Sequence, residues 1–182
     1  MKKHTFIFVA ILLLVVGLTG AFASGAPEEQ TWDLPQTGQR ATYGSGSDGA
    51  YEKGIVWEDN ARFSSVGTSV LIDDLTGLMW ARSAVISPRS WAAAVDYANQ
   101  STYAGFDDWR LPNMREMRSL LHYGRDTAVW LKGVGFTELE NAGYWTSTTY
   151  YYSTGSAWYV HLVEGVSYFA SKSSSYHVLL VR

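Results

Sequence analysis

The sequence contains no cysteine. Disulfide bonds, thiol nucleophiles and cysteine metal sites are therefore excluded, and the folded protein must be stabilised by core packing. Lipid modification of a cysteine is excluded for the same reason. Histidine is also scarce, and the histidines form neither an HxH nor an HExxH motif, which argues against a zinc site. They are His4, His122, His161 and His177.

Basic residues are few and are not clustered. The 182 residues include 14 Lys and Arg against 17 Asp and Glu, which gives a formal net charge of −3. A nucleic-acid-binding protein needs clustered Lys and Arg to neutralise phosphates, so a nucleic acid is not expected as a partner. The GxSxG motif of serine hydrolases is absent as well. We expect a protein without enzymatic activity and without a cofactor.

The longest apolar run lies at the N-terminus. Lys2 and Lys3 precede an apolar stretch from Phe6 to Gly20, and Ala21-Phe22-Ala23 has the small-x-small pattern of a cleavage site. Residues 1–23 are predicted to be a signal peptide, which implies export to the periplasm, the cell surface or the medium. Cleavage would leave 12 basic residues (14 − 2) against 17 acidic ones, a net charge of −5. The alternative is an uncleaved membrane anchor, because the apolar stretch is close to bilayer-spanning length.

The next segment, residues 24–65, has few aliphatic residues and many Gly, Ser, Asp and Gln. Its SGSDG stretch is a turn signal. We expect a linker followed by an extended N-terminal arm, which lies over the domain formed by residues 66–182.

The first half of that domain predicts a β-hairpin and two helices. Two short apolar runs, residues 70–72 and 78–80, flank an Asp-Asp-Leu-Thr-Gly turn and predict the hairpin. Ser90 can cap a helix with apolar residues at i, i+3, i+4 and i+7. Asn113 and Glu116 predict a capping box for the second helix, and Gly124 is suited to end it.

The C-terminal part predicts strands. AWYVHLVEG alternates and places Trp158, Val160 and Leu162 on one face, so Trp158 and Val160 are expected in the core. VSYFASKSSSYHVLLVR predicts one or two further strands around a polar turn. Strands, two helices and a final sheet, in this order, predict an α+β fold with an antiparallel sheet.

Several segments in a fixed order carry a family resemblance. They are LIDDLTGLMWAR, SWAAAVDYANQ, GFDDWRLPNMREMRSLL, GYWTSTTY, SAWYVHLVEG and the closing VLLVR. Over residues 34–182 the chain resembles the DUF1566 family, also called the Lcl C-terminal domain after a Legionella collagen-like adhesin. The resemblance implies a C-type lectin-like fold, with two helices packed on a twisted antiparallel sheet and with neighbouring termini.

The family is similar to formylglycine-generating enzymes and to retroelement-diversified variable proteins, whose C-terminal strands present the ligand surface. This sequence lacks the reactive cysteines of those enzymes. It also lacks the EPN or QPD and WND motifs of calcium-dependent sugar-binding lectins. The Legionella adhesin binds sulfated polysaccharides with basic residues, but after Tyr144 this chain has only Lys172 and Arg182 as fixed positive charges. For this chain the resemblance therefore implies neither formylglycine chemistry, nor a calcium-dependent sugar site, nor a basic site for sulfated polysaccharides.

Adjacent carboxylates are the candidate metal ligands. Asp107 and Asp108, beside Arg110, could form a cation site or an acid–base pair, or a structural corner in which Arg110 binds carbonyls or a carboxylate. Asp73 and Asp74, like Asp33, could bind a metal, but carboxylates in such loops more often stabilise turns. The structural interpretation is favoured throughout, and no metal is expected.

A segment rich in tyrosine and serine, YYYSTGS, lies between the scaffold-like GYWTST and AWYV segments. Side chains alternate along a strand, so three consecutive tyrosines cannot all be buried. Tyr supplies large contact area at low entropic cost, and Ser and Gly supply adaptable polar contacts. A second such segment, VSYFASKSSSYH, is expected beside it. The predicted ligand-binding residues are Tyr150, Tyr151, Tyr152, Ser153, His161, Tyr168, Lys172, Ser174 and Tyr176.

These features favour an exported recognition domain that binds a carbohydrate or a surface protein through aromatic and hydroxyl side chains. Tyr and Ser codons also arise readily when adenines of an Asn codon are mutated, so diversification by a retroelement is a further hypothesis. The alternative is a structural cell-envelope protein, whose aromatic residues form its core and the contacts of a homo-oligomer such as a trimer. An enzyme ranks third.

Overall fold

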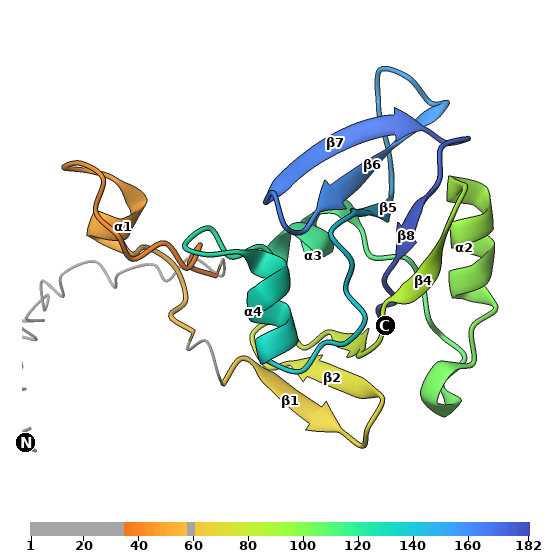
Figure 1. Ribbon diagram of the computed structural model, residues 1–182, viewed down its shortest axis with the longest axis horizontal. Coiled ribbons are helices and arrows are strands. Elements are labelled where there is room, and N and C mark those ends of the chain that lie inside the picture. Colours follow the sequence, from red (N-terminus) through yellow and green to blue (C-terminus); the bar gives the residue numbers. More distant parts are fainter. Residues whose placement is uncertain (1–34, 58–60) are drawn as a thin grey trace, which may run out of the picture. The chain divides into compact units, whose positions relative to one another are not determined.

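The chain folds into short helices and strands in the computed structural model, which describes residues 35–57 and 61–182 (Figure 1). The predicted signal peptide, with His4, and Asp33 lie outside the described residues. The helices are α1 (Asp48–Tyr51), α2 (Trp91–Asn99), α3 (Met114–Ser119) and α4 (Thr127–Gly133), with a 3₁₀ turn at Tyr103–Gly105. The strands are β1 (Phe63–Val66), β2 (Val70–Asp73), β3 (Met79–Ala81), β4 (Val85–Arg89), β5 (Gly143–Thr149), β6 (Ser156–His161), β7 (Val166–Ser171) and β8 (Tyr176–Val178). Within the described ranges, no helix is both long enough and apolar enough to cross a membrane.

The strands form two sheets. One has the order β1-β2-β3 and the other the order β4-β8-β5-β6-β7. All pairs are antiparallel except β5 and β8, which run parallel. The predicted α+β class is therefore observed. The expectation of two helices on one antiparallel sheet is wrong in detail, because the described residues form four α-helices and a second sheet, and the β5–β8 pair makes the larger sheet mixed.

Neighbouring residues of the larger sheet enter two different cores. Tyr144 and Val160 are buried in one core, whereas Trp145 and Ala157 are buried in the other. Helix α3 contacts β5 and β6, and α2 contacts β5 and β8 (Figure 1). The closing residues 178–181 alternate between the cores in the same way. Because both faces are buried here, a one-residue slip of register would move every side chain into the wrong core.

Both predicted helices are observed. Ala94 and Ala98 form the buried face of α2. At the start of α3 the Asn113 side chain accepts the Glu116 N–H at 3.0 Å, while the Glu116 carboxylate accepts the Asn113 N–H at 2.8 Å. The capping box predicted from the sequence is therefore complete.

The end of α3 differs from the prediction. The helix ends at Ser119, and Gly124 lies beyond it. A Cβ atom on Gly124 would lie 2.4 Å from the carbonyl oxygen of Gly38. Glycine is needed at this position because the N-terminal segment passes close to the backbone, and not because a helix ends there.

Helix α4 has no counterpart in the sequence prediction. The Asp126 carboxylate accepts the N–H of Val129 at 3.0 Å and caps the helix. Trp130 and Leu131 are buried on its inner face. With seven residues the helix is too short for its apolar period to stand out from the sequence.

The segment before β1 packs on the rest of the domain. The Trp57 indole donates to the Gln36 carbonyl at 2.9 Å, and its ring centroid lies 5.0 Å from that of Trp130 and 5.2 Å from that of His122. His122 is buried in this aromatic cluster. The predicted arm thus supplies a core side chain, and β1 begins at Phe63, before the predicted domain start.

The predicted hairpin is β2–β3, in which Leu71 pairs with Trp80. Asp73 ends β2 and binds Arg62 through two hydrogen bonds of 2.9 and 2.7 Å. Its carboxylate also accepts from the Leu75 N–H at 3.2 Å and the Thr76 hydroxyl at 2.8 Å. Asp73 therefore stabilises the turn, in agreement with the structural interpretation of this carboxylate.

The Arg62–Asp73 ion pair is fully buried. Both side chains have 0% of their surface exposed. The Arg62 guanidinium carbon lies 5.3 Å from the centre of the Trp57 ring and 5.1 Å from that of Phe63. These contacts join the N-terminal segment, β1 and the hairpin turn through one cation.

Replacing Arg62 with Met should lower the free energy of unfolding by about 3–5 kcal/mol, because the Asp73 charge would be left buried without a partner. Urea unfolding measures this loss. The double variant Arg62→Met/Asp73→Asn should recover part of the stability, since no buried charge remains. A loss below about 1 kcal/mol in the single variant would contradict a structural role for the pair.

Candidate functional site

Four aromatic rings gather where β5, β6 and β7 meet the β5–β6 loop. Tyr150 stacks on Phe169 with the ring centroids 4.0 Å apart and an angle of 8° between the planes. The Trp158 ring meets both edge-on, at 5.4 Å from Tyr150 and 5.8 Å from Phe169. Tyr152 lies 5.8 Å from Tyr150. We call these four residues the hairpin aromatic cluster.

Backbone hydrogen bonds hold the loop that carries the cluster. The Tyr150 N–H donates to the Ser156 carbonyl at 2.9 Å, and the Ser156 N–H donates to the Ser153 carbonyl at 2.8 Å. The Lys172 N–H donates to the Gly155 carbonyl at 2.8 Å, which ties the loop to the end of β7. Tyr151 and Tyr152 nevertheless remain 85% and 83% exposed. The loop thus presents large rings to solvent on an ordered backbone.

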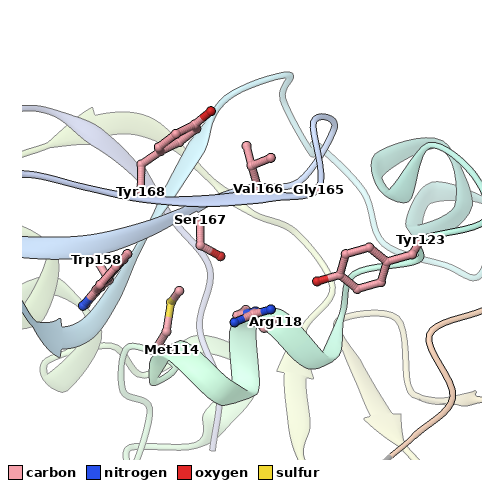
Figure 2. Close-up of a pocket in the computed structure, with 8 residues that line it drawn as sticks. All are labelled: Met114, Arg118, Tyr123, Trp158, Gly165, Val166, Ser167 and Tyr168. Atoms are coloured by element: carbon pink, nitrogen blue, oxygen red, sulfur yellow. The ribbon is translucent and has the colours of Figure 1, made fainter. Parts of the chain in front are cut away.

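An open groove of about 690 Å³ continues from the cluster. Trp158 belongs to both, and Figure 2 shows the side chains of Met114, Arg118, Tyr123 and Ser167 around the same hollow. Gly165, Val166 and Tyr168 complete the lining. The groove therefore lies between α3 and the β6–β7 hairpin.

Three polar groups face this groove. In Figure 2 the Ser167 hydroxyl and the Tyr123 hydroxyl point toward the hollow in which the Arg118 guanidinium lies. Among the described residues, the Arg118 side chain has no hydrogen-bond or ion-pair partner. A free guanidinium offers five donors, and the hydroxyls can donate or accept. The groove combines apolar walls with unused hydrogen-bonding capacity.

The structure divides the predicted site residues between two faces. Tyr150 and Tyr152 belong to the hairpin aromatic cluster, whereas Tyr168 and Tyr176 lie on the opposite face of the sheet around Tyr159. Figure 2 shows the Tyr168 ring pointing away from the groove, although its backbone lines it. The two tyrosine-rich segments are adjacent, as expected, because Ser156 pairs with Ser171. They do not form a single face.

The remaining predicted residues have structural partners. Lys172, predicted to bind a ligand, is half-buried. Its ammonium group donates to the Thr149 hydroxyl at 2.9 Å and lies 4.1 Å from the centre of the Trp91 ring. The His161 ring accepts the Glu164 N–H at 3.4 Å in the β6–β7 turn. Ser174 donates its N–H to the Ser171 carbonyl at 2.9 Å, and the Ser153 hydroxyl lies 3.5 Å from that of Ser156.

Sequence reasoning missed part of the groove. Of the residues that line it, Met114, Arg118 and Tyr123 were not singled out as site residues. Trp158 was expected in the core but is half-buried, because its ring lines the open groove between α3 and the β6–β7 hairpin. Its aromatic neighbour Phe169 is 50% exposed. Nothing in the sequence distinguishes Arg118 from an ordinary solvent-exposed Arg on an amphipathic helix.

The opposite face carries a ladder of three tyrosines. Tyr159 stacks on Tyr176 at 4.1 Å and lies 5.9 Å from Tyr168. Burial, together with a hydrogen bond to Tyr176, raises the pKa of Tyr159 to about 12. Its hydroxyl therefore stays protonated at physiological pH.

Gly143 allows this ladder to form. A Cβ atom on Gly143 would lie 2.6 Å from Cδ2 of Tyr159 and 2.7 Å from Cδ1 of Tyr176. The two rings therefore occupy the space that any other side chain on β5 would need.

Replacing Gly143 with Ala should lower the free energy of unfolding by about 1–3 kcal/mol, because the stacked rings would have to move apart. Thermal unfolding would measure the change. Gly155→Ala is the matched control, since no atom lies within 4 Å of the Cβ position there. Equal effects of the two changes would contradict the packing argument.

The carboxylates near Arg110 form a structural corner. Arg110 binds Glu116 through two hydrogen bonds of 2.7 and 2.8 Å. Asp108 binds Arg182 at 2.6 Å, and the Trp109 indole donates to the Tyr103 carbonyl at 2.8 Å. No group of three or more His, Asp or Glu in the described part of the chain could hold a metal ion. The structural interpretation of this segment therefore accounts for its contacts.

The Arg110–Glu116 pair predicts an effect of acid. Burial would raise the pKa of the Glu116 carboxyl, but the bonds from Arg110 and from the Asn113 N–H outweigh it and hold the pKa below the ordinary 4.5. A lowered folded-state pKa gives stability that is present above pH 4.5 and is lost as the pH falls through the lowered value. Between neutral and acidic pH, Glu116→Gln should therefore lose less stability than the unmodified protein.

Denaturant unfolding at several pH values measures this difference. Asp107→Asn is the control, because that exposed carboxylate forms no ion pair with another described residue. If the pH dependence of Glu116→Gln equals that of the unmodified protein, the pair makes no pH-dependent contribution.

Comparison with known proteins identifies the family of the domain. The family model of the Lcl C-terminal domain matches residues 69–182, which is more than half of the chain. The matched range includes every described strand except β1, and all the residues that line the groove. A search of curated proteins found no match. The chain therefore belongs to the Lcl C-terminal domain family.

Proposed function

We propose that the protein is an exported, non-enzymatic recognition domain that binds a carbohydrate through the hairpin aromatic cluster and the adjoining groove. The observation that carries the proposal is the continuity of these two surfaces through Trp158. Aromatic faces can pack against the C–H faces of sugar rings, while nearby donors and acceptors bind the hydroxyls.

The groove has the chemical composition that a sugar requires. Trp158 and Met114 provide apolar contact, and Arg118, Tyr123 and Ser167 provide hydrogen-bonding groups. Tyr152 adds an exposed ring at the hairpin end. A ligand that lies along the cluster and enters the groove would meet both kinds of contact.

The same lining supports binding without catalysis. Neither a carboxylate nor an imidazole is among the side chains that line the groove in the described part of the chain. Glycoside hydrolysis needs a pair of carboxyl groups, and general acid–base catalysis usually needs His, Glu or Asp. The groups that are present can donate hydrogen bonds and orient a ligand.

We also propose that the domain has a C-type lectin-like fold. The support is that residues 180–182 return to pair with β3, since the Met79 N–H donates to the Arg182 carbonyl at 3.0 Å and the Ala81 N–H donates to that of Leu180 at 3.0 Å. The end of the chain is thereby joined to an early strand, and the ligand surface lies on the C-terminal strands.

Tyr152→Ala and Arg118→Ala should each weaken glycan binding by about tenfold or more, the usual effect of removing an aromatic or Arg anchor from an interface. A glycan array would identify a ligand, and calorimetry would give the affinities. Tyr43→Ala is the matched control, because Tyr43 is also a solvent-exposed ring, at 79%, but belongs to neither surface.

Two outcomes would overturn the carbohydrate proposal. The first is unchanged affinity for the identified glycan in both variants. The second is that the unmodified protein binds no glycan; binding to a cell-surface protein that Tyr152→Ala abolishes would then indicate a protein ligand. Loss of self-association in Tyr152→Ala, with no ligand found, would favour the structural cell-envelope alternative.

A further inference from the structure

Strand β7 is a free edge of the five-stranded sheet. It is the last strand in the order β4-β8-β5-β6-β7 and pairs only with β6 among the described strands. Its sequence, VSYFAS, contains no charged residue, no proline and no glycine. Protein edge strands usually carry a charge, a proline or a bulge that prevents pairing with another chain. This edge has none of these features.

The outward backbone groups of β7 can be assigned from its pairing with β6. The Lys172 N–H donates to the Gly155 carbonyl, so the backbone groups of residue 172 point toward β6. In an antiparallel pair every second residue does so, and the residues between them point their N–H and C=O groups the other way. Ser167, Phe169 and Ser171 therefore direct their backbone groups away from β6. Of these outward groups, only the Ser171 carbonyl has a partner among the described residues, the N–H of Ser174 at 2.9 Å.

We propose that β7 pairs antiparallel with β7 of a second copy of this chain, about a two-fold axis at Tyr168. A two-fold axis perpendicular to the sheet leaves the corresponding faces of the two copies on the same side of the sheet. Two directly paired residues share a face, and side chains alternate along a strand. The residue numbers of each pair must therefore both be odd or both be even, which gives an even sum. The axis can then pass through Tyr168 or through Phe169 near the centre of the strand. With either axis, the outward-facing backbone groups of one copy can form hydrogen bonds with those of the other.

The Ser171 carbonyl selects the axis at Tyr168, because it already accepts the Ser174 N–H at 2.9 Å. In this register the central hydrogen-bonded pair joins Ser167 to Phe169 of the second copy, and the same pair occurs twice. The backbone groups of Ser167 and Phe169 that point outward have no partner among the described residues. An axis at Phe169 would instead pair Ser167 with Ser171, whose carbonyl would have to give up the Ser174 N–H, so that register is less stable.

The pairing brings the two grooves together. Ser167, which lines the groove, would lie opposite Phe169 of the second copy, so each copy adds an aromatic ring to the other's groove. Both grooves would lie on the same face of a continuous ten-stranded sheet (5 + 5 strands). This consequence for ligand binding rests on the proposed function, whereas the association itself does not. Two sites on one face can bind a repeating ligand with higher avidity than either site alone.

Cysteine cross-linking tests both the association and its register, because the natural chain has no cysteine. Tyr168→Cys should form an intermolecular disulfide under mild oxidation, since two facing residues of a non-hydrogen-bonded pair have Cα atoms about 4.5 Å apart. Phe169→Cys should cross-link poorly, because position 169 faces position 167 of the second copy. The two substituted positions would then be diagonal neighbours, about 7–8 Å apart. Tyr151→Cys is the exposed control and should not cross-link above the background of random collisions.

Sedimentation of the unmodified protein at micromolar concentration should show a dimer, and Tyr168→Lys should dissociate it by placing like charges opposite each other at the axis. Tyr151→Lys is the control for the added charge. Circular dichroism and thermal unfolding would confirm that each variant is folded. A monomer in the unmodified protein, or cross-linking by Phe169→Cys in preference to Tyr168→Cys, would overturn the proposal. Glycan affinity, measured separately, reports on the proposed function without depending on these outcomes.

Discussion

The division of the larger sheet's side chains between two cores is the constraint on which the rest of the structure depends. Tyr144 and Trp145 are neighbours in β5, yet they are fully buried in different clusters, and residues 178–181 repeat the pattern. A strand buried on both faces cannot shift by one residue without exchanging every contact. The register of β5, β6 and β8 is thereby fixed, and the loop and strand ends that extend beyond the cores are held in defined positions.

The aromatic residues at the hairpin end gain their arrangement from this constraint. Neither core needs Tyr150, Tyr152 or Phe169, but the loop backbone and the β6–β7 register place their rings next to Trp158. A surface whose rings are already ordered loses little entropy on binding, which is the physical advantage of preorganisation. The opposite face uses its tyrosines differently, because Tyr159 and Tyr176 close over Gly143 and stabilise the sheet.

The sequence predicted the features that depend on local chemistry. The β2–β3 hairpin, the capping box at Asn113 and the apolar face of α2 follow from turn residues, capping geometry and periodicity, and all three are observed. It did not predict features that depend on distant partners. Trp57 enters the core through contacts with Trp130, and Arg62 is buried because Asp73 lies opposite it. Likewise, Trp158 has the alternation of a core residue, but in the structure it lines the open groove and stays half-exposed.

In the proposed function, the hairpin aromatic cluster and the groove act as one binding surface. The most direct measurement is a ¹H–¹⁵N NMR titration of the protein with an oligosaccharide identified on an array. Chemical-shift changes should be concentrated in residues 150–153, at Arg118 and Tyr123, and along Gly165–Phe169. Changes confined to the face that carries Tyr159 and Tyr176, or spread evenly over the protein, would contradict this proposal.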